Sequence, residues 1–144
     1  MVYPEQFTAP MRAELSENGV IETRTPEDVD QLLSPGSGTV LMVVNSVCGC
    51  AAGSARPGVL KSLESEPRPS KVATVFAGGD VAAVARVREI LSEYPPSSPS
   101  AALFQDGKSV YMLHRHEIEG RDPNEISRVL KQAYQTHCVK EPQV

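Results

Sequence analysis

The sequence predicts an α/β fold in which two layers of helices enclose a central mixed β-sheet. Apolar, β-branched segments alternate with helical segments along most of the chain, and strands separated by helices are typically parallel. Near the C-terminal end, two short strands meet at Asp106-Gly107, a strong hairpin signal that adds an antiparallel edge. The chain has 144 residues, 40% of them hydrophobic, so we expect one domain over residues 1–144 with a full core.

Helices and strands alternate from the start of the chain. The spacing of Met11 and Leu15 predicts a helix over 8–17, and a short strand over 20–23 follows. Thr25 and Pro26 are typical of a helix start, with the threonine as N-cap. The run from Thr39 to Val44 is apolar throughout, as in a strand that is covered on both faces.

A helix is predicted over 49–63, bent near Pro57-Gly58 because proline lacks a backbone N–H. The next strand is predicted over 71–76. Asp80 is the expected N-cap of the helix after it, whose apolar side would hold Val81, Val84, Val87, Ile90 and Leu91.

The hairpin strands are predicted over 101–104 and 110–113, and a last helix begins at Asp122-Pro123, where Asp122 starts a capping pattern. Its buried side is expected to hold Ile126, Val129, Leu130, Ala133 and Tyr134.

Charge and composition argue against several classes of partner. The net charge of -4 and the absence of tryptophan disfavour nucleic-acid binding. The longest strongly apolar run is far too short to cross a membrane, and the N-terminus does not resemble a secretory signal. Three cysteines are an odd number that does not suit a secreted disulfide framework, so we expect a reducing cytoplasm.

The most informative residues are Cys48-Gly49-Cys50, which lie between the buried strand and the next helix. The helix N-terminus favours a thiolate, so Cys48, the thiol nearest the loop, is the expected attacking group, and Cys50 would displace its adduct. A buried, inert pair is the plainer alternative. Metal binding is a third, with Cys138 and either His114 or His116 completing a set of four ligands.

Four other side chains keep two interpretations each. His114 and His116 are expected on one face of a strand, as surface residues or in proton transfer. Cys138 is expected to be a partly exposed terminal thiol, with a redox role as the alternative. Arg56 is expected on a helix surface, or beside a thiolate or an acidic substrate group.

The order of elements resembles the thioredoxin fold, and the segment from Pro99 to Lys108 resembles the part of that fold in which a cis-proline precedes a hairpin. A closer resemblance, over nearly the whole chain, is to the bacilliredoxin family. It is carried by residues 10–15, 44–53, 55–57, 75–78, 97–100 and 115–120, which include Val44-Asn45-Ser46-Val47-Cys48-Gly49-Cys50 and Arg115-His116-Glu117-Ile118-Glu119-Gly120. Gly79 departs from the expected polar residue, away from the cysteines.

The resemblance implies reduction of mixed disulfides between protein cysteines and the small thiol bacillithiol. It implies Cys48 as nucleophile, Cys50 as resolving thiol and Pro99 as a cis-proline that helps to present the substrate backbone. The partners would be bacillithiolated or disulfide-bonded client proteins and bacillithiol itself, which acts as co-substrate, with no bound cofactor. The alternatives are a general protein disulfide oxidoreductase or isomerase, and a metal or iron-sulfur carrier that uses the same cysteines.

Overall fold

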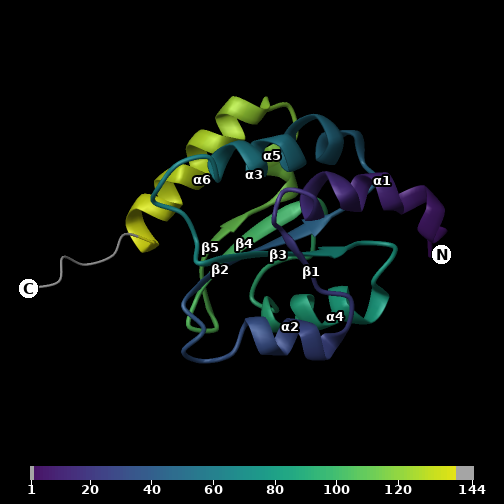
Figure 1. The fold of residues 1–144 in the computed structure, drawn as a ribbon, viewed down its shortest axis with the longest axis horizontal. Helices are drawn as coiled ribbons and strands as arrows, with labels where there is room; N and C mark the ends of the chain where they lie inside the picture. The colour runs from purple at the N-terminus through teal and green to yellow at the C-terminus, as the bar shows by residue number, and fades with distance from the viewer. Residues whose placement is uncertain (1, 139–144) are drawn as a thin grey trace, which may run out of the picture.

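A five-stranded mixed sheet in the order β1-β3-β2-β4-β5 forms the centre of the computed structural model, which describes residues 2–138 (Figure 1). β1 and β2 pair with β3 in parallel, β4 pairs with β2 antiparallel, and β5 pairs with β4 antiparallel. The prediction of parallel strands with an antiparallel edge is therefore confirmed. The strands are β1 (Ile21–Glu22), β2 (Thr39–Asn45), β3 (Lys71–Phe76), β4 (Ser100–Gln105) and β5 (Lys108–Leu113).

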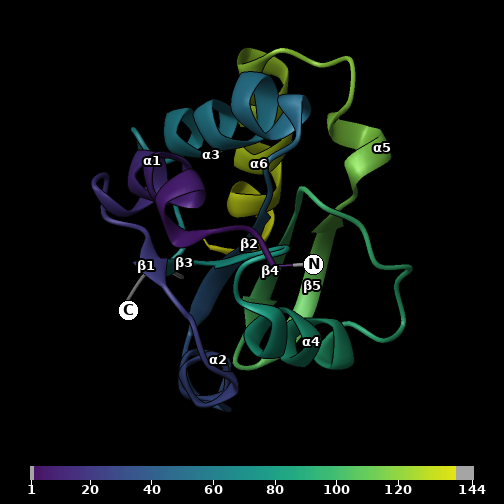
Figure 2. The ribbon, with the colours of Figure 1, turned by 90° about the vertical axis from the view of Figure 1, so that its right-hand side faces the viewer.

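Helices cover both faces of the sheet, as Figures 1 and 2 show from two directions. One layer contains α1 (Glu5–Ser16), α3 (Arg56–Ser62) and α6 (Pro123–His137), and the other contains α2 (Pro26–Leu32) and α4 (Val81–Ile90). Two short elements complete the fold, a π-helical turn at Ala51–Ala55 and α5 (Arg115–Ile118), which follows β5. The α/β sandwich with a central mixed sheet is thus confirmed.

The central strand β2 explains why the sequence selects two helical layers. Leu41 and Val43 point into the core under α1, α3 and α6, whereas Val40, Met42 and Val44 point into the core over α2 and α4. Each of these side chains is at most 3% exposed. Because successive strand residues face opposite sides, an unbroken apolar run requires cover on both faces.

Close packing of α3 against α6 fixes the helix that follows the cysteine turn. A Cβ atom at Gly58 would lie 2.5 Å from Cβ of Ile126, so only glycine permits this approach of the two helices. Further along, the buried Tyr134 hydroxyl hydrogen-bonds Ser62 Oγ at 2.9 Å.

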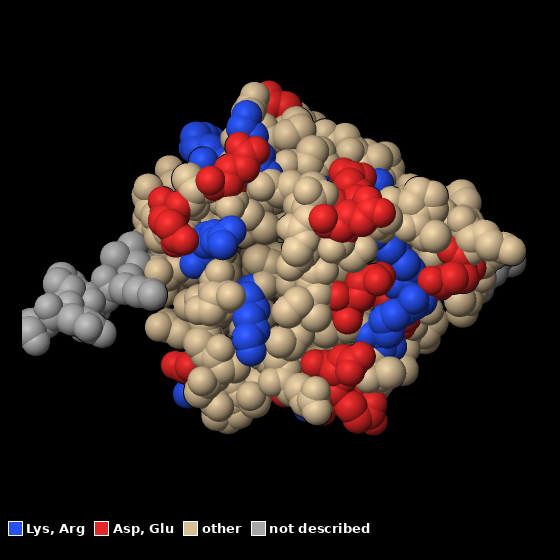
Figure 3. Space-filling view, in the orientation of Figure 1, with Lys and Arg blue, Asp and Glu red and all other residues tan. Residues whose placement is uncertain are grey.

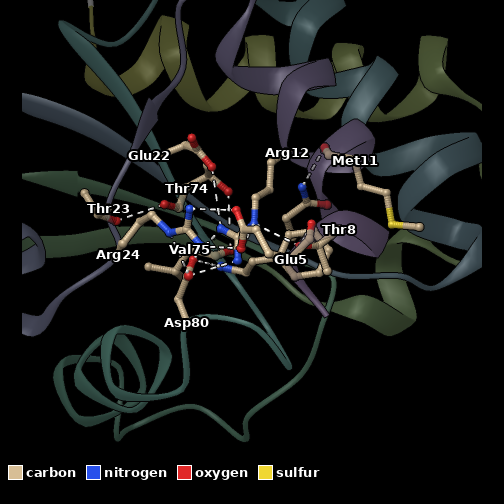
Figure 4. A network of polar contacts seen from close by, with 12 residues as sticks. Glu5, Thr8, Met11, Arg12, Glu22, Thr23, Arg24, Thr74, Val75 and Asp80 are labelled. Carbon is tan, nitrogen blue, oxygen red and sulfur yellow. Dashed lines mark hydrogen bonds and ion pairs between the residues drawn. The ribbon is translucent and has the colours of Figure 1, made fainter. Parts of the chain in front are cut away.

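A buried ion pair joins α1 to the turn after β3 (Figure 4). Both terminal nitrogens of Arg12 donate to the Asp80 carboxylate at 2.9 Å, and the Phe76 backbone N–H donates to the same carboxylate at 3.0 Å. Arg24 adds a bond from Nε to Asp80 Oδ1 at 3.3 Å. Asp80 is at the N-cap position of α4, as predicted, but its side chain makes no capping hydrogen bond. Its carboxylate accepts hydrogen bonds from this network instead.

Gly79 belongs to the same network. A Cβ atom there would lie 2.5 Å from an Arg12 terminal nitrogen, so the residue that departs from the family pattern makes room for the guanidinium.

Several local predictions are confirmed. Thr25 and Asp122 accept hydrogen bonds from Asp28 N and Glu125 N as N-caps. Asp106 and Gly107 have φ values of 52° and 87°, as a tight hairpin turn requires.

The prediction that Val81 belongs to the apolar side of α4 was wrong, because Val81 is 57% exposed. The helix predicted over 49–63 is confirmed as helical backbone over 49–62. Its first part is a π-helical turn that ends at Ala55, close to the bend predicted at Pro57-Gly58.

Charged side chains of both signs lie close together on the face shown in Figure 3. Among residues 2–138, no helix has the length and apolar character needed to cross a membrane.

Candidate thiol site

The cysteine pair lies on the turn that connects β2 to α3. The Cys48 carbonyl accepts the Ala51 and Ala52 N–H groups at 3.0 and 3.2 Å, and the Cys48 N–H donates to Ser46 Oγ at 3.2 Å. Both cysteines are free thiols and partly exposed, and their sulfur atoms are 2.8 Å apart. The interpretation of an inert, fully buried pair is wrong, because the thiols are accessible to substrates.

Arg56 fixes the turn from the protein interior. It is only 4% exposed, and its Nη1 donates to Asn45 Oδ1 and to the Ser46 carbonyl, each at 2.9 Å. Its Nε donates to Glu14 Oε1 on α1 at 2.8 Å. The expectation of a helix-surface arginine was wrong, because Arg56 is buried. Within residues 2–138 its hydrogen bonds go to Glu14, Asn45 and Ser46 and not to a sulfur, and contact with an acidic group of a substrate stays a prediction. Arg56 holds the backbone that precedes Cys48.

The arginine that does contact the Cys48 sulfur is Arg115 of α5. Its Nη2 donates to Cys48 Sγ at 3.2 Å, and its Nη1 donates to the Ser98 carbonyl at 3.0 Å. Its Nε donates to the Glu119 carboxylate, and its backbone N–H donates to Ser97 Oγ at 3.3 Å. Arg115 thus connects the thiol to the loop before β4.

These contacts make the two thiols unequal. The hydrogen bond from the Cys50 side chain, with a smaller effect of the Arg115 charge, holds the pKa of Cys48 below that of an ordinary thiol. Burial raises the pKa of Cys50, which packs against the core, and its hydrogen bond to Cys48 acts in the same direction. Cys48 is therefore the more acidic thiol of the pair, and Cys50 the less acidic one.

The Ser98–Pro99 peptide bond is cis. The same Arg115 side chain donates to the Ser98 carbonyl and to the Cys48 sulfur, so it links this segment to the thiol. That Pro99 presents the substrate backbone stays a prediction.

The two histidines do not lie on a strand, so that prediction was wrong. His114 is the N-cap residue of α5 and His116 lies within it. Their rings stack with centroids 5.3 Å apart, and Tyr94 meets the His114 ring edge-on at 5.7 Å. Both histidines lie beside Arg115, and so near the thiol pair.

Cys138 lies apart from the other cysteines. It ends α6 and lies near Thr39 at the start of β2, whereas Cys48 follows the other end of that strand. Burial against the core raises the pKa of Cys138. The set of four ligands proposed for a metal is therefore not brought together, and residues 2–138 contain no cluster of three His, Cys, Asp or Glu side chains that fits a metal ion.

The geometry defines a class of protein: a thioredoxin-type fold with a thiol pair at the end of its central strand. Solved structures support the fold. A putative oxidoreductase with a thioredoxin fold matches with a TM-score of 0.63 and 15% identity, covering 83% of this chain and 96% of that one. A thioredoxin mutant from Halobacterium salinarum matches with a TM-score of 0.59 and 16% identity, covering 87% and 96%.

Sequence comparisons identify the family. Residues 3–138 match the family described as Disulphide isomerase. A bacilliredoxin from Cytophaga hutchinsonii is 52% identical over 92% of this chain and 98% of its own. A bacilliredoxin from Halalkalibacterium halodurans is 48% identical over 94% of each chain. The chain belongs to the bacilliredoxin family and is a thiol-disulfide redox protein, which confirms the resemblance seen in its sequence.

Proposed function

We propose that this protein is an oxidoreductase that reduces mixed disulfides between protein cysteines and bacillithiol. The observation that carries the proposal is the unequal thiol pair: Cys48 is partly exposed and its pKa is lowered, and its sulfur is 2.8 Å from that of Cys50, whose pKa is raised. The names of the curated relatives support the choice of small thiol. The odd cysteine count supports a reducing cytoplasm as the compartment.

The reaction consists of two thiol-disulfide exchanges. In the first, the Cys48 thiolate attacks the sulfur of the small thiol, so a Cys48–small-thiol disulfide forms and the client cysteine leaves as a thiolate. In the second, Cys50 loses its proton to solvent and attacks Cys48 Sγ, which releases the small thiol as a thiolate. Two electrons pass from the cysteine pair to the mixed disulfide, and an external thiol or dithiol reductant must return them.

The position of the sulfurs supports this order of events. The two atoms are 2.8 Å apart, so the resolving step needs little movement of the turn. The Ser98 carbonyl accepts a hydrogen bond from Arg115, and in the proposed reaction the Ser98-Pro99 segment would contact the client backbone. The proposal requires no bound cofactor.

Exchange between two protein disulfides is the second candidate. The description of the matching family, Disulphide isomerase, favours it. The same Cys48 thiolate would then attack a client disulfide, and Cys50 would release the trapped client.

The experiment is mass spectrometry of the protein after incubation with a model protein carrying bacillithiol on its one cysteine. The Cys50→Ala variant should accumulate the bacillithiol adduct on Cys48, the wild type should form the internal disulfide, and the Cys48→Ala variant should leave the client unchanged. The matched control, Cys138→Ala, should behave as the wild type. If neither the wild type nor Cys50→Ala removes bacillithiol from the client, the proposal is wrong. A faster reaction with a scrambled protein disulfide would favour the second candidate.

A further inference from the structure

A cleft that Arg115 helps to line lies between the loop before β4 and the residues of α5. It is lined by Pro95–Ser97 on one side and by His114–His116 with Glu119 on the other, and its volume is about 360 Å³. That volume lies at the lower end of the range for small-molecule sites.

Arg115 belongs both to the cleft and to the contact shell of the nucleophile. It lines the cleft, and its Nη2 is 3.2 Å from Cys48 Sγ. A group bonded to this sulfur therefore starts next to the guanidinium. In the first exchange proposed above, the group that becomes bonded to Cys48 is the small thiol, not the client.

The polar groups of the cleft favour a negative charge. An arginine has five N–H donors, and the described residues engage three of those of Arg115, through Glu119, Ser98 and Cys48. One N–H on each terminal nitrogen is left for a ligand. The stacked imidazoles of His114 and His116 add further donors, and His116 is exposed.

One carboxylate, that of Glu119, opposes these groups, and it is already paired with Arg115 Nε. Pro95 and Pro96 supply the apolar wall. The cleft thus offers donors from three side chains and a carboxylate that is already partnered.

We infer that this cleft binds the carboxylate-bearing part of the small-thiol substrate, with Arg115 and His116 as its recognition residues. The inference rests on the proposed function and deepens it, because it makes the charge of the small thiol a determinant of rate. A client that carries an anionic thiol reacts faster than one that carries a cationic thiol of similar size.

The test compares three adducts of one model client, formed with mercaptosuccinate, which has two carboxylates, with neutral 2-mercaptoethanol and with cationic cysteamine. The rate of each reduction by the full-length protein is divided by the rate with free dithiothreitol, which removes the intrinsic reactivity of the adduct. In the wild type we expect the normalised rate for mercaptosuccinate to exceed that for cysteamine by about two- to fivefold at low salt, the effect of an exposed ion pair.

Substitutions in the cleft separate recognition from thiolate reactivity. Arg115→Gln also changes Cys48, but this affects all three adducts alike, so the ratio of rates reports only the cleft. The ratio should fall in Arg115→Gln and in His116→Gln, and approach one when both are present. The matched control is His137→Gln, at the C-terminal end of α6, which should keep the wild-type ratio.

The outcomes distinguish failure of the cleft as a recognition site from failure of the proposed reaction. Equal normalised rates for the three adducts in the wild type, or a preference that survives both cleft substitutions, would overturn the inference while leaving the proposed reaction intact. Failure to reduce any adduct, with Cys48 present, would remove the proposed function itself.

Discussion

Replacing Asp80 by asparagine tests the buried ion pair that joins α1 to the sheet. The side chains of Arg12 and Asp80 are 6% and 4% exposed, and the pair has two hydrogen bonds of 2.9 Å. Asparagine keeps the shape but removes the charge, so the Arg12 guanidinium remains buried without a full partner. Breaking a buried pair in this way costs about 3–5 kcal/mol.

For a chain of 144 residues, 1 kcal/mol corresponds to about 3 °C in the midpoint of thermal unfolding. We therefore expect Asp80→Asn to lower Tm by about 10–15 °C, measured by circular dichroism or calorimetry. The matched control is Asp30→Asn, which breaks the surface pair with Arg86, whose side chains are 50% and 37% exposed. Water screens that pair, so Tm should hardly change.

A double replacement separates the charge from the packing. Arg12→Met with Asp80→Leu removes both charges of the pair together and should recover part of the lost stability. The recovery is limited because the Phe76 N–H and Arg24 lose the carboxylate and Glu22 loses Arg12. The reasoning is refuted if Asp80→Asn and Asp30→Asn lower Tm equally, since burial would then not decide the strength of the pair.

Three further predictions concern the thiol, the helix contact and a buried hydroxyl. Arg115→Gln should raise the pKa of Cys48. The pH at which Cys48 begins to be alkylated rapidly is expected below that of an ordinary thiol in the wild type, and it should move to a higher pH in the variant. An unchanged pH profile of alkylation would contradict the contact between Arg115 and Cys48. Gly58→Ala should destabilise by about 1–3 kcal/mol in urea unfolding, because the added methyl group meets α6. Gly53→Ala, with no described atom within 4 Å of the added carbon, is the control that should be tolerated. Tyr134→Phe should cost about 1 kcal/mol near pH 7 through the lost hydrogen bond. Burial raises the pKa of Tyr134 above its unfolded value, so its hydroxyl stabilises below about pH 10 and this contribution is lost as the pH rises further; a constant difference between wild type and variant up to pH ~11 would contradict this.

Local patterns were sufficient for most of the framework. The apolar run of β2 predicted burial on both faces, and Asp106-Gly107 predicted the hairpin, because each depends on neighbouring residues alone. Thr25 and Asp122 were recognised as caps for the same reason.

The sequence did not predict features that depend on distant partners. The carboxylate of Asp80 has the local surroundings of a cap, but it accepts hydrogen bonds from Arg12, 68 residues away, and none from the N–H groups that begin α4. α5 has only four residues and no repeating apolar pattern, so its histidines were assigned to a strand.

The arginines of the site show the same limit. Arg56 is close to the cysteines in sequence and turns inward, whereas Arg115, 67 residues from Cys48, reaches the sulfur. The one signal that included Arg115 was the Arg115-His116-Glu117 segment, which pointed to a family and not to a contact. The cysteines themselves were found because their position after a buried strand is a local property.

Two different kinds of contact flank the cysteine turn. Arg56 bonds Asn45 in the protein interior, and the Arg115–Glu119 pair is exposed to solvent. Buried contacts to the backbone hold the side towards β2, and a solvent-exposed pair holds the side towards α5. When Cys48 exchanges its negative charge for a covalent adduct, its attraction to Arg115 weakens, and the rearrangement falls on the α5 side. We expect the oxidation state of the protein to be reported by the position of α5, while the sheet stays unchanged.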